Sequence, residues 1–214
     1  PSGNFGNIYA GFLARSMGVP IRRLILATNE NNVLEEFFTT GVYRPRSATD
    51  TLATSSPSMD ISKASNLERF IWALLGPEAF VQHWTELEAT GTLDLRDQLS
   101  RLGEEFGFVA GRSSHADRLE AIRTVKERSG RLIDPHTADG ITVALSTMEP
   151  GFPTLVMETA KAAKFPQTVA EALGKDPETP DIIADLLTRP QKVETIDNEE
   201  APLRALIEER ALTS

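Results

Sequence analysis

The sequence predicts an α/β fold in which helices cover a parallel β-sheet. Apolar segments with strand character alternate with helices that carry capping residues, and the first three elements follow the order helix, strand, helix. In sheets of this kind, ligands collect beyond the carboxyl ends of the strands. A chain of 214 residues suits one large domain or two small ones, and it is long enough to bury a hydrophobic core.

Glycine, proline and capping residues define the first elements. The predicted elements are a helix at 7–17, a strand at 21–27, a helix that begins after Asn32, and an ordered loop at 41–62. Gly18 is suited to the left-handed conformation that follows a helix, and Pro20 prevents the helix from continuing. Asn32 and Glu35 have the spacing of a capping box. The loop at 41–62 is rich in Ser, Thr and Pro. Its length is compatible with a functional segment or with a surface loop that has no functional role.

Helices dominate the predicted middle of the chain. Ser65 and Glu68 match the capping-box pattern, and Gly76 with Pro77 ends the helix that follows. The apolar stripe of this helix consists of Leu67, Phe70, Ile71, Leu74 and Leu75. The further predicted elements are a helix at 77–89, a shorter helix within 91–103, a strand at 106–110, a helix from 113 or 114 to about 128, and a short strand at 131–133.

The last part of the chain opens on a helix start that directly follows a predicted strand. Asp134 can cap this helix, and Pro135 occupies its first position. Beyond it the sequence predicts a buried strand at 154–157 and helices at 166–173, 179–187 and 201–212.

Composition excludes several classes of protein. A net charge of −9 argues against a sequence-independent grip on nucleic acid. The chain has no cysteine, and its three histidines lack metal-ligand spacing, so we expect neither a disulfide scaffold nor a bound metal. No apolar run approaches the roughly 20 residues of a membrane span. We therefore expect a soluble, cytoplasmic protein, and the missing initiator methionine suggests part of a longer chain.

A glycine-containing loop at 2–7 runs straight into the first helix and is the strongest indication of function. Its glycines allow backbone N–H groups to converge on an anion, and the helix that follows adds unpaired N–H groups and the positive end of its dipole. No Asp or Glu occurs from Pro1 through Ala14 to repel a dianion. The loop is therefore interpreted as a phosphate cradle, with an ordinary glycine turn as the alternative.

Several segments together resemble threonine synthase. They are Ser2–Asn7, Ala27–Asn31, Ser56–Ile61, Ser65–Arg69 and Asp134–Ala138, in the order that the family has. The resemblance implies that residues 1–214 are the carboxyl-terminal part of the catalytic region of a fold type II pyridoxal-phosphate enzyme. The implied fold is a three-layer, Rossmann-like α/β domain with a parallel sheet. The implied activity is that of a carbon–oxygen lyase, converting O-phospho-L-homoserine and water to L-threonine and phosphate in the last step of threonine biosynthesis.

The resemblance also implies which residues bind the cofactor, pyridoxal 5'-phosphate. The residues that match the family's cofactor-phosphate loop are Gly3, Asn4, Phe5, Gly6 and Asn7. Asn7 replaces a common Asp and keeps its capping ability. Thr159 matches a threonine that hydrogen-bonds the pyridine nitrogen, although Lys161 and Ala162 replace the family's His and Pro. From the residues alone, Thr159 merely ends a predicted strand.

The family's Schiff-base lysine lies upstream of the glycine loop, so we expect it before Pro1. The lysines of this chain lie in polar contexts, and none is assigned a catalytic role. The chain alone is therefore expected to be inactive without the missing amino-terminal part. Asn66 and Arg69 are candidates for binding the substrate phosphate. Other polar residues that could border the pocket, without an assigned role, are Ser56, Ser58, Asp60 and His136.

Two other functions remain open from the sequence. One is a related fold type II enzyme such as a threonine deaminase, although its loop usually carries further glycines where this chain has Phe5. The other is a non-catalytic module that binds a phosphorylated ligand without a lysine. A lysine in the matching upstream motif distinguishes an enzyme from a binding module.

Overall fold

The computed structural model describes residues 1–211, apart from the side chains of residues 182, 183 and 187. It divides into two units, Pro1–Glu178 and Thr179–Ser214. The helices of the first unit are α1 (Gly6–Ser16), α2 (Val33–Thr40), α3 (Leu67–Leu75), α4 (Pro77–Thr90), α5 (Leu99–Glu104), α6 (His115–Ser129), α7 (Pro135–Thr147) and α8 (Pro166–Leu173). Its strands are β1 (Leu24–Thr28), β2 (Val42–Tyr43), β3 (Leu93–Asp94) and β4 (Phe108–Arg112).

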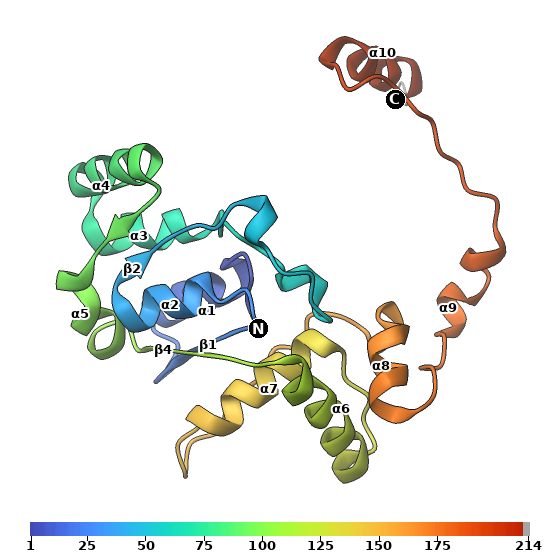
Figure 1. Cartoon of the computed structure of the whole chain (residues 1–214), viewed down its shortest axis with the longest axis horizontal. Coiled ribbons are helices and arrows are strands. Elements are labelled where there is room, and N and C mark those ends of the chain that lie inside the picture. Colours follow the sequence, from blue (N-terminus) through green and yellow to red (C-terminus); the bar gives the residue numbers. More distant parts are fainter. Residues whose placement is uncertain (212–214) are drawn as a thin grey trace. The chain divides into compact units, whose positions relative to one another are not determined.

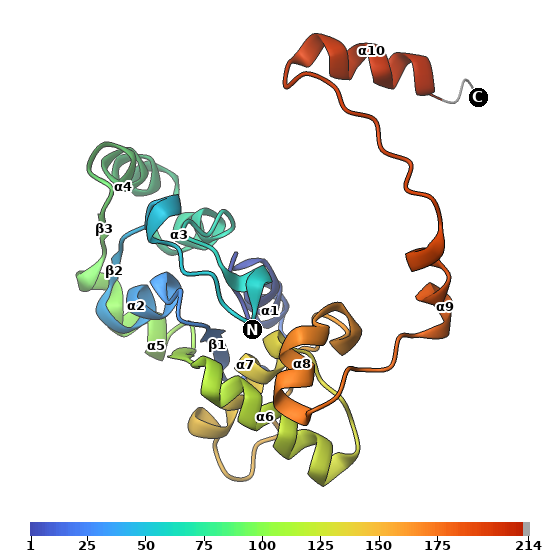
Figure 2. The same cartoon turned by 45° about the vertical axis from the view of Figure 1, so that its right-hand side comes forward.

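The parallel strands β1 and β4 form the centre of the first unit. Leu24 lies opposite Phe108 in this pair, and both side chains enter the hydrophobic core that α1, α2 and α3 also line. On the other face of the sheet, Gly111 meets Val143 of α7. Figure 1 and Figure 2 show α1 and α2 on one side of the strands and α7 on the other. The predicted α/β fold with helices on a parallel sheet is thus confirmed.

Most predicted helices are present, because their capping residues and their apolar stripes indicate the same helix boundaries and the same buried face. Gly18, Gly76 and Gly130 have the positive φ angles that suit glycine after a helix. Four of the five stripe residues of α3 are buried, and Leu75 packs partly against the same core. Ser114 caps α6 in a capping box with Asp117. Among the described residues, no helix is long and apolar enough to cross a bilayer.

Two predicted strands are wrong. Residues 131–133 connect α6 directly to the cap of α7, and residues 154–157 are extended without forming part of a sheet. Both segments have strand-like composition, but neither has a hydrogen-bonded neighbouring strand in the part of the chain that the structure describes. The predicted helix within 91–103 is confined to α5, because Leu93 and Asp94 pair with β2 instead.

Two predicted capping boxes are also wrong. Ser65 does not cap α3, because its hydroxyl and its backbone N–H both bind Asn4. Asn32 precedes α2 but donates its side-chain amide to Glu35 rather than accepting a bond from the helix backbone. In both cases the sequence pattern is present and a different hydrogen bond forms.

The second unit contains short helices along an exposed chain. They are α9 (Asp181–Ala184), a 3-10 helix (Leu186–Thr188) and α10 (Glu200–Arg210). Arg210 Nη2 lies 2.6 Å from Glu194 Oε2. The predicted helix at 179–187 is thus shorter than expected, whereas α10 closely matches the helix predicted at 201–212. Leu212, the last residue of that prediction, lies outside the described residues.

Candidate functional site

The loop that precedes α1 presents a row of backbone donors. Ser2 N–H donates to Ala27 O (3.0 Å), which fixes the start of the loop beside the carboxyl end of β1. Among the hydrogen bonds of the described residues, the N–H groups of residues 3–8 take part in none. Six consecutive free donors at the positive end of a helix are suited to a phosphate group.

The backbone of Phe5 bends sharply at the start of α1. Its φ of +63° places a bulky residue in the left-handed region, whereas Gly6 begins a right-handed helix. Successive residues of opposite hand form a concave nest of N–H groups that favours anions. The Phe5 side chain is fully buried against Phe38, Phe70 and Phe108, with ring centroids 5.6, 5.8 and 5.9 Å away. Burial of the ring offsets the backbone strain, and only the Phe5 backbone is left to contribute to a ligand site.

The start of α3 and the segment before it clamp the loop. Asn4 Oδ1 accepts bonds from Ser65 N (2.5 Å) and Ser65 Oγ (2.9 Å), and Asn4 O accepts one from Asn66 Nδ2 (2.9 Å). A Cβ on Gly3 would lie 2.7 Å from Met59 Cα, so the two backbones are in direct contact there. The loop is therefore held by side chains and by close packing, leaving its N–H groups free.

The long loop predicted at 41–62 supports this clamp. Asn29 Nδ2 and Asn31 Nδ2 each donate to Asp60 Oδ1 over 2.9 Å, and Thr54 N donates to Asp60 Oδ2 over 2.8 Å. These bonds tie the loop to the carboxyl end of β1 and hold Met59 beneath Gly3. The loop is ordered as predicted, and it contacts the cradle rather than extending away from it.

His136 links the start of α7 to the same loop. Its Nε2 accepts a hydrogen bond from Ser58 N (3.0 Å), so its Nδ1 carries the proton and donates to Asp134 Oδ1 (2.7 Å). Burial raises the pKa of Asp134, but hydrogen bonds from His136 and Thr137 outweigh it and hold this pKa below its usual value. His136 is therefore a buried structural link, and its ring also packs edge-on against Phe165.

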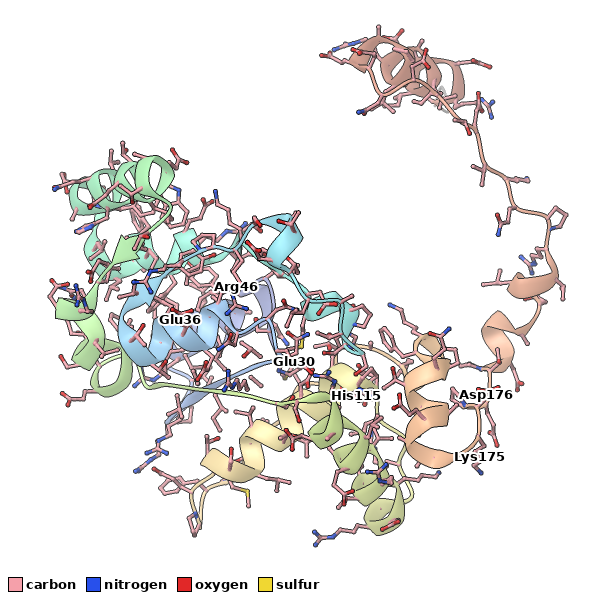
Figure 3. The ribbon with its side chains drawn as sticks, in the orientation of Figure 1. Glu30, Glu36, Arg46, His115, Lys175 and Asp176 are labelled. Carbon is pink, nitrogen blue, oxygen red and sulfur yellow. The ribbon has the colours of Figure 1, made fainter. Side chains whose placement is uncertain are left out.

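A buried arginine, which no sequence pattern indicated, links the segment after β1 to α7 and to the loop at 41–62. The Arg118 side chain is fully buried on α6, donates twice to Glu30 over 2.9 Å, and also binds Asp139 (3.0 Å) and Ser55 Oγ (2.8 Å). Burial raises the pKa of Asp139, and its Oδ2 has no partner among the described residues. Figure 3 shows Glu30 beside His115, whose backbone N–H also donates to it. The hydrophobic periodicity of the α6 sequence does not distinguish Arg118 from the other arginines of this helix.

Of the other predicted site residues, Asn66 contacts the loop before α1, whereas Arg69 and Thr159 do not hydrogen-bond to it. Asn66 contacts it through its amide, whereas Arg69 lines a separate cavity of 330 Å³ with Tyr9, Trp72 and others. Thr159 is exposed in an extended segment and makes no hydrogen bond to any described residue. Within residues 1–211, no group of His, Cys, Asp or Glu side chains is arranged to hold a metal ion.

Comparisons with known proteins agree on one family. A family model described as "Threonine synthase, C-terminal" matches residues 137–207. The threonine synthases of Methylobacillus glycogenes and Corynebacterium glutamicum are each 50% identical to the chain, over 98% and 93% of its length and over 45% and 42% of theirs. The crystal structure of threonine synthase from Brucella melitensis with bound PLP aligns with a TM-score of 0.88 at 34% identity, over 98% of this chain and 45% of that one.

The yeast threonine synthase structure aligns in the same way, with a TM-score of 0.84 at 31% identity over 98% of this chain and 46% of that one. The chain therefore spans less than half the length of the relatives it matches. Over nearly all of its own length the chain is homologous to threonine synthases, and its residues 137–207 match the model of their carboxyl-terminal part.

Proposed function

We propose that this chain provides the cofactor-phosphate cradle of a threonine synthase, which converts O-phospho-L-homoserine and water to L-threonine and phosphate. The observation that carries the proposal is the run of free N–H groups at residues 3–8, held open at the start of α1. The homology to a PLP-bound threonine synthase supports pyridoxal 5'-phosphate as the ligand. The matching residues of the cradle are Gly3, Asn4, Phe5, Gly6 and Asn7.

Each group of the cradle has a distinct part in this proposal. The N–H groups of residues 3–8 bind the phosphate dianion without a counter-charged side chain, and α1 adds its dipole. Asn4 and Asn66 hold the loop through hydrogen bonds and do not themselves have to touch the ligand. Bound pyridoxal phosphate supplies an electron sink for carbanion chemistry, and the protein supplies orientation and proton transfer.

Three further residues have proposed roles beyond the phosphate loop. The Thr159 hydroxyl is proposed to hydrogen-bond the pyridine nitrogen of the cofactor, where a neutral donor leaves that nitrogen less firmly protonated than a carboxylate does. Arg69 and Asn66 are proposed to bind the substrate phosphate. The amide Nδ2 of Asn66 already donates to Asn4 O, so its free oxygen is a poor anion ligand. The base and Schiff-base lysine are proposed to come from the region of threonine synthases that this chain does not span.

Two experiments test the proposal. Pyridoxal phosphate added to this chain is expected to raise its melting temperature without an internal-aldimine absorbance band, since the chain has no assigned lysine. A chimera that carries the preceding region of the Methylobacillus glycogenes enzyme is expected to show the band and to release phosphate from O-phospho-L-homoserine. An aldimine band in the isolated chain contradicts the lysine assignment.

The same chimera separates the alternatives. Ammonia release from threonine in place of phosphate release indicates a deaminase, and cofactor binding with neither reaction indicates a binding module. Cofactor binding that is unchanged by Gly3→Ala contradicts the cradle. The matched control is Gly103→Ala, where an added methyl group has space. We keep the cytoplasm as the proposed location, which a fluorescent fusion tests.

A further inference from the structure

Arg118 of α6 has a fully buried side chain that contacts three groups from other parts of the chain. Its guanidinium donates to both carboxylate oxygens of Glu30 (2.9 Å each), to Asp139 Oδ1 (3.0 Å) and to Ser55 Oγ (2.8 Å). The desolvation of buried charges offsets much of their mutual attraction, so such a cluster is weak evidence for stability. A planar guanidinium with three partners does, however, specify where those partners lie.

Ser55 is the partner of Arg118 that belongs to the long loop clamping the cradle. It lies just before a 3-10 turn, which the bond from Met59 N to Ser56 O (3.0 Å) closes. Met59 in turn lies against Gly3, where an added Cβ would be 2.7 Å from Met59 Cα. A short stretch of the loop therefore connects Arg118 to the first glycine of the cradle.

The bond from Arg118 also fixes the direction of the hydrogen bonds around Ser55. A guanidinium can only donate, so Ser55 Oγ accepts from Arg118, and its own hydroxyl hydrogen is left to donate to His115 Nδ1 (2.7 Å). His115 Nε2 then carries the ring proton and donates to Glu171 Oε1 (2.8 Å). The Ser55 hydroxyl thus has one defined donor and one defined acceptor, and α6 carries both.

We propose that Arg118 is a positioning residue for the cofactor-phosphate cradle, which it holds through Ser55 and Met59. This inference rests on the proposed function. A neighbouring bond, from Thr168 Oγ1 to Ser55 O over 3.4 Å, joins neutral groups, whereas the charged donor of Arg118 forms a shorter and stronger one. The N–H groups of residues 3–8 bind phosphate tightly only while Met59 keeps the start of their loop in place. Arg118 therefore raises the affinity for the cofactor without touching it.

Ser55→Ala tests the inference, because it removes the link to the loop and leaves the ion pairs of Arg118 intact. In the Methylobacillus glycogenes chimera, we expect the dissociation constant of pyridoxal 5'-phosphate to rise about tenfold, the effect of one lost hydrogen bond to a charged group. An absorbance titration with the cofactor measures this constant. An unchanged constant overturns the inference.

The matched control is Ser114→Ala, which removes the cap of the same helix without breaking a bond to the loop. It is expected to change the dissociation constant by less than about twofold, because substitutions without shared partners act independently. An equal loss of affinity in Ser114→Ala and Ser55→Ala overturns the inference, because it assigns the effect to the stability of α6.

A double substitution separates positioning from a general weakening of the cluster. Arg118→Lys keeps a positive charge for Glu30 and Asp139 but loses the planar fork that also reaches Ser55, so it is expected to weaken cofactor binding as well. Because both changes break the same link, Ser55→Ala added to Arg118→Lys is expected to weaken binding no further. Effects that multiply identify two independent contributions and overturn the inference.

The same chimera distinguishes a failure of this inference from a failure of the proposed function. Affinity that falls in Ser55→Ala, in a chimera that releases no phosphate from O-phospho-L-homoserine, contradicts the proposed function and supports the inference. Phosphate release with unchanged affinity in Ser55→Ala does the reverse. An unmodified chimera that binds no cofactor contradicts both.

Discussion

Replacing Gly3 with alanine tests whether the cradle depends on close backbone packing. Gly3 has no positive φ, so the conformation itself accepts alanine, and the only obstacle is space. The new Cβ would lie 2.7 Å from Met59 Cα and 3.1 Å from Met59 O. Neither atom belongs to a flexible side chain, and the bonds to Asp60 hold that backbone in place.

The expected cost follows from this overpacking. Forcing an extra methyl group into a well-packed site destabilises a protein by about 1–3 kcal/mol. For a chain of this size, each kcal/mol lowers the melting temperature by about 2–4 °C. Gly3→Ala is therefore expected to melt about 2–12 °C below the unmodified chain.

Thermal unfolding followed by far-ultraviolet circular dichroism measures the effect, with Gly103→Ala as the control. Gly103 lies in α5, where the nearest atom to an added Cβ is Phe108 O at 4.0 Å. Alanine there is expected to stabilise the chain by about 0.5–1 kcal/mol. Phosphate is also expected to raise the melting temperature of the unmodified chain more than that of Gly3→Ala. A Gly3→Ala chain that melts at or above the unmodified temperature refutes the reasoning.

Three further substitutions test the supports of the site. Burial raises the pKa of Asp134, but hydrogen bonds from His136 and Thr137 hold this pKa below its usual value. The ionised carboxylate therefore contributes fully to the free energy of unfolding above about pH 4, and this contribution is lost as the pH falls through the lowered pKa. In urea unfolding, Asp134→Asn should destabilise the chain more at pH 7 than at pH 2. Tyr43→Phe leaves the buried Ala64 N–H without its acceptor and should cost about 1–3 kcal/mol, and an unchanged urea midpoint contradicts this. Ser114→Ala removes the cap of α6 and should cost about 1 kcal/mol, whereas Ser114→Gly should cost only a few tenths.

Local signals were enough to predict most helices and the loop that precedes α1. Asp134 and Ser114 cap helices as their sequence patterns indicate, and Gly76 separates α3 from α4. These features depend on neighbours within a few residues of the chain, so the sequence contains the relevant interaction. The glycine loop before α1 belongs to the same class, since its free N–H groups follow from its place at a helix start.

Long-range partners decided the features that sequence patterns missed. Ser65 has the spacing of a capping residue, but Asn4, 61 residues earlier, takes its hydrogen bonds. Arg118 resembles the other arginines of its helix until folding buries it against Glu30 and Asp139. The segment at 154–157 has the composition of a strand, yet a strand also needs a neighbour, and the described residues provide none.

The sequence by itself determined that this protein has an α/β fold with a glycine-containing loop before its first helix, because caps, apolar periodicity and glycines act locally. Only the tertiary structure decided how the cradle is held. The left-handed backbone of Phe5 is stable because three distant aromatic rings enclose its side chain, and Gly3 is required because Met59 lies against it. Both facts depend on contacts between segments far apart in the chain, which no local pattern specifies.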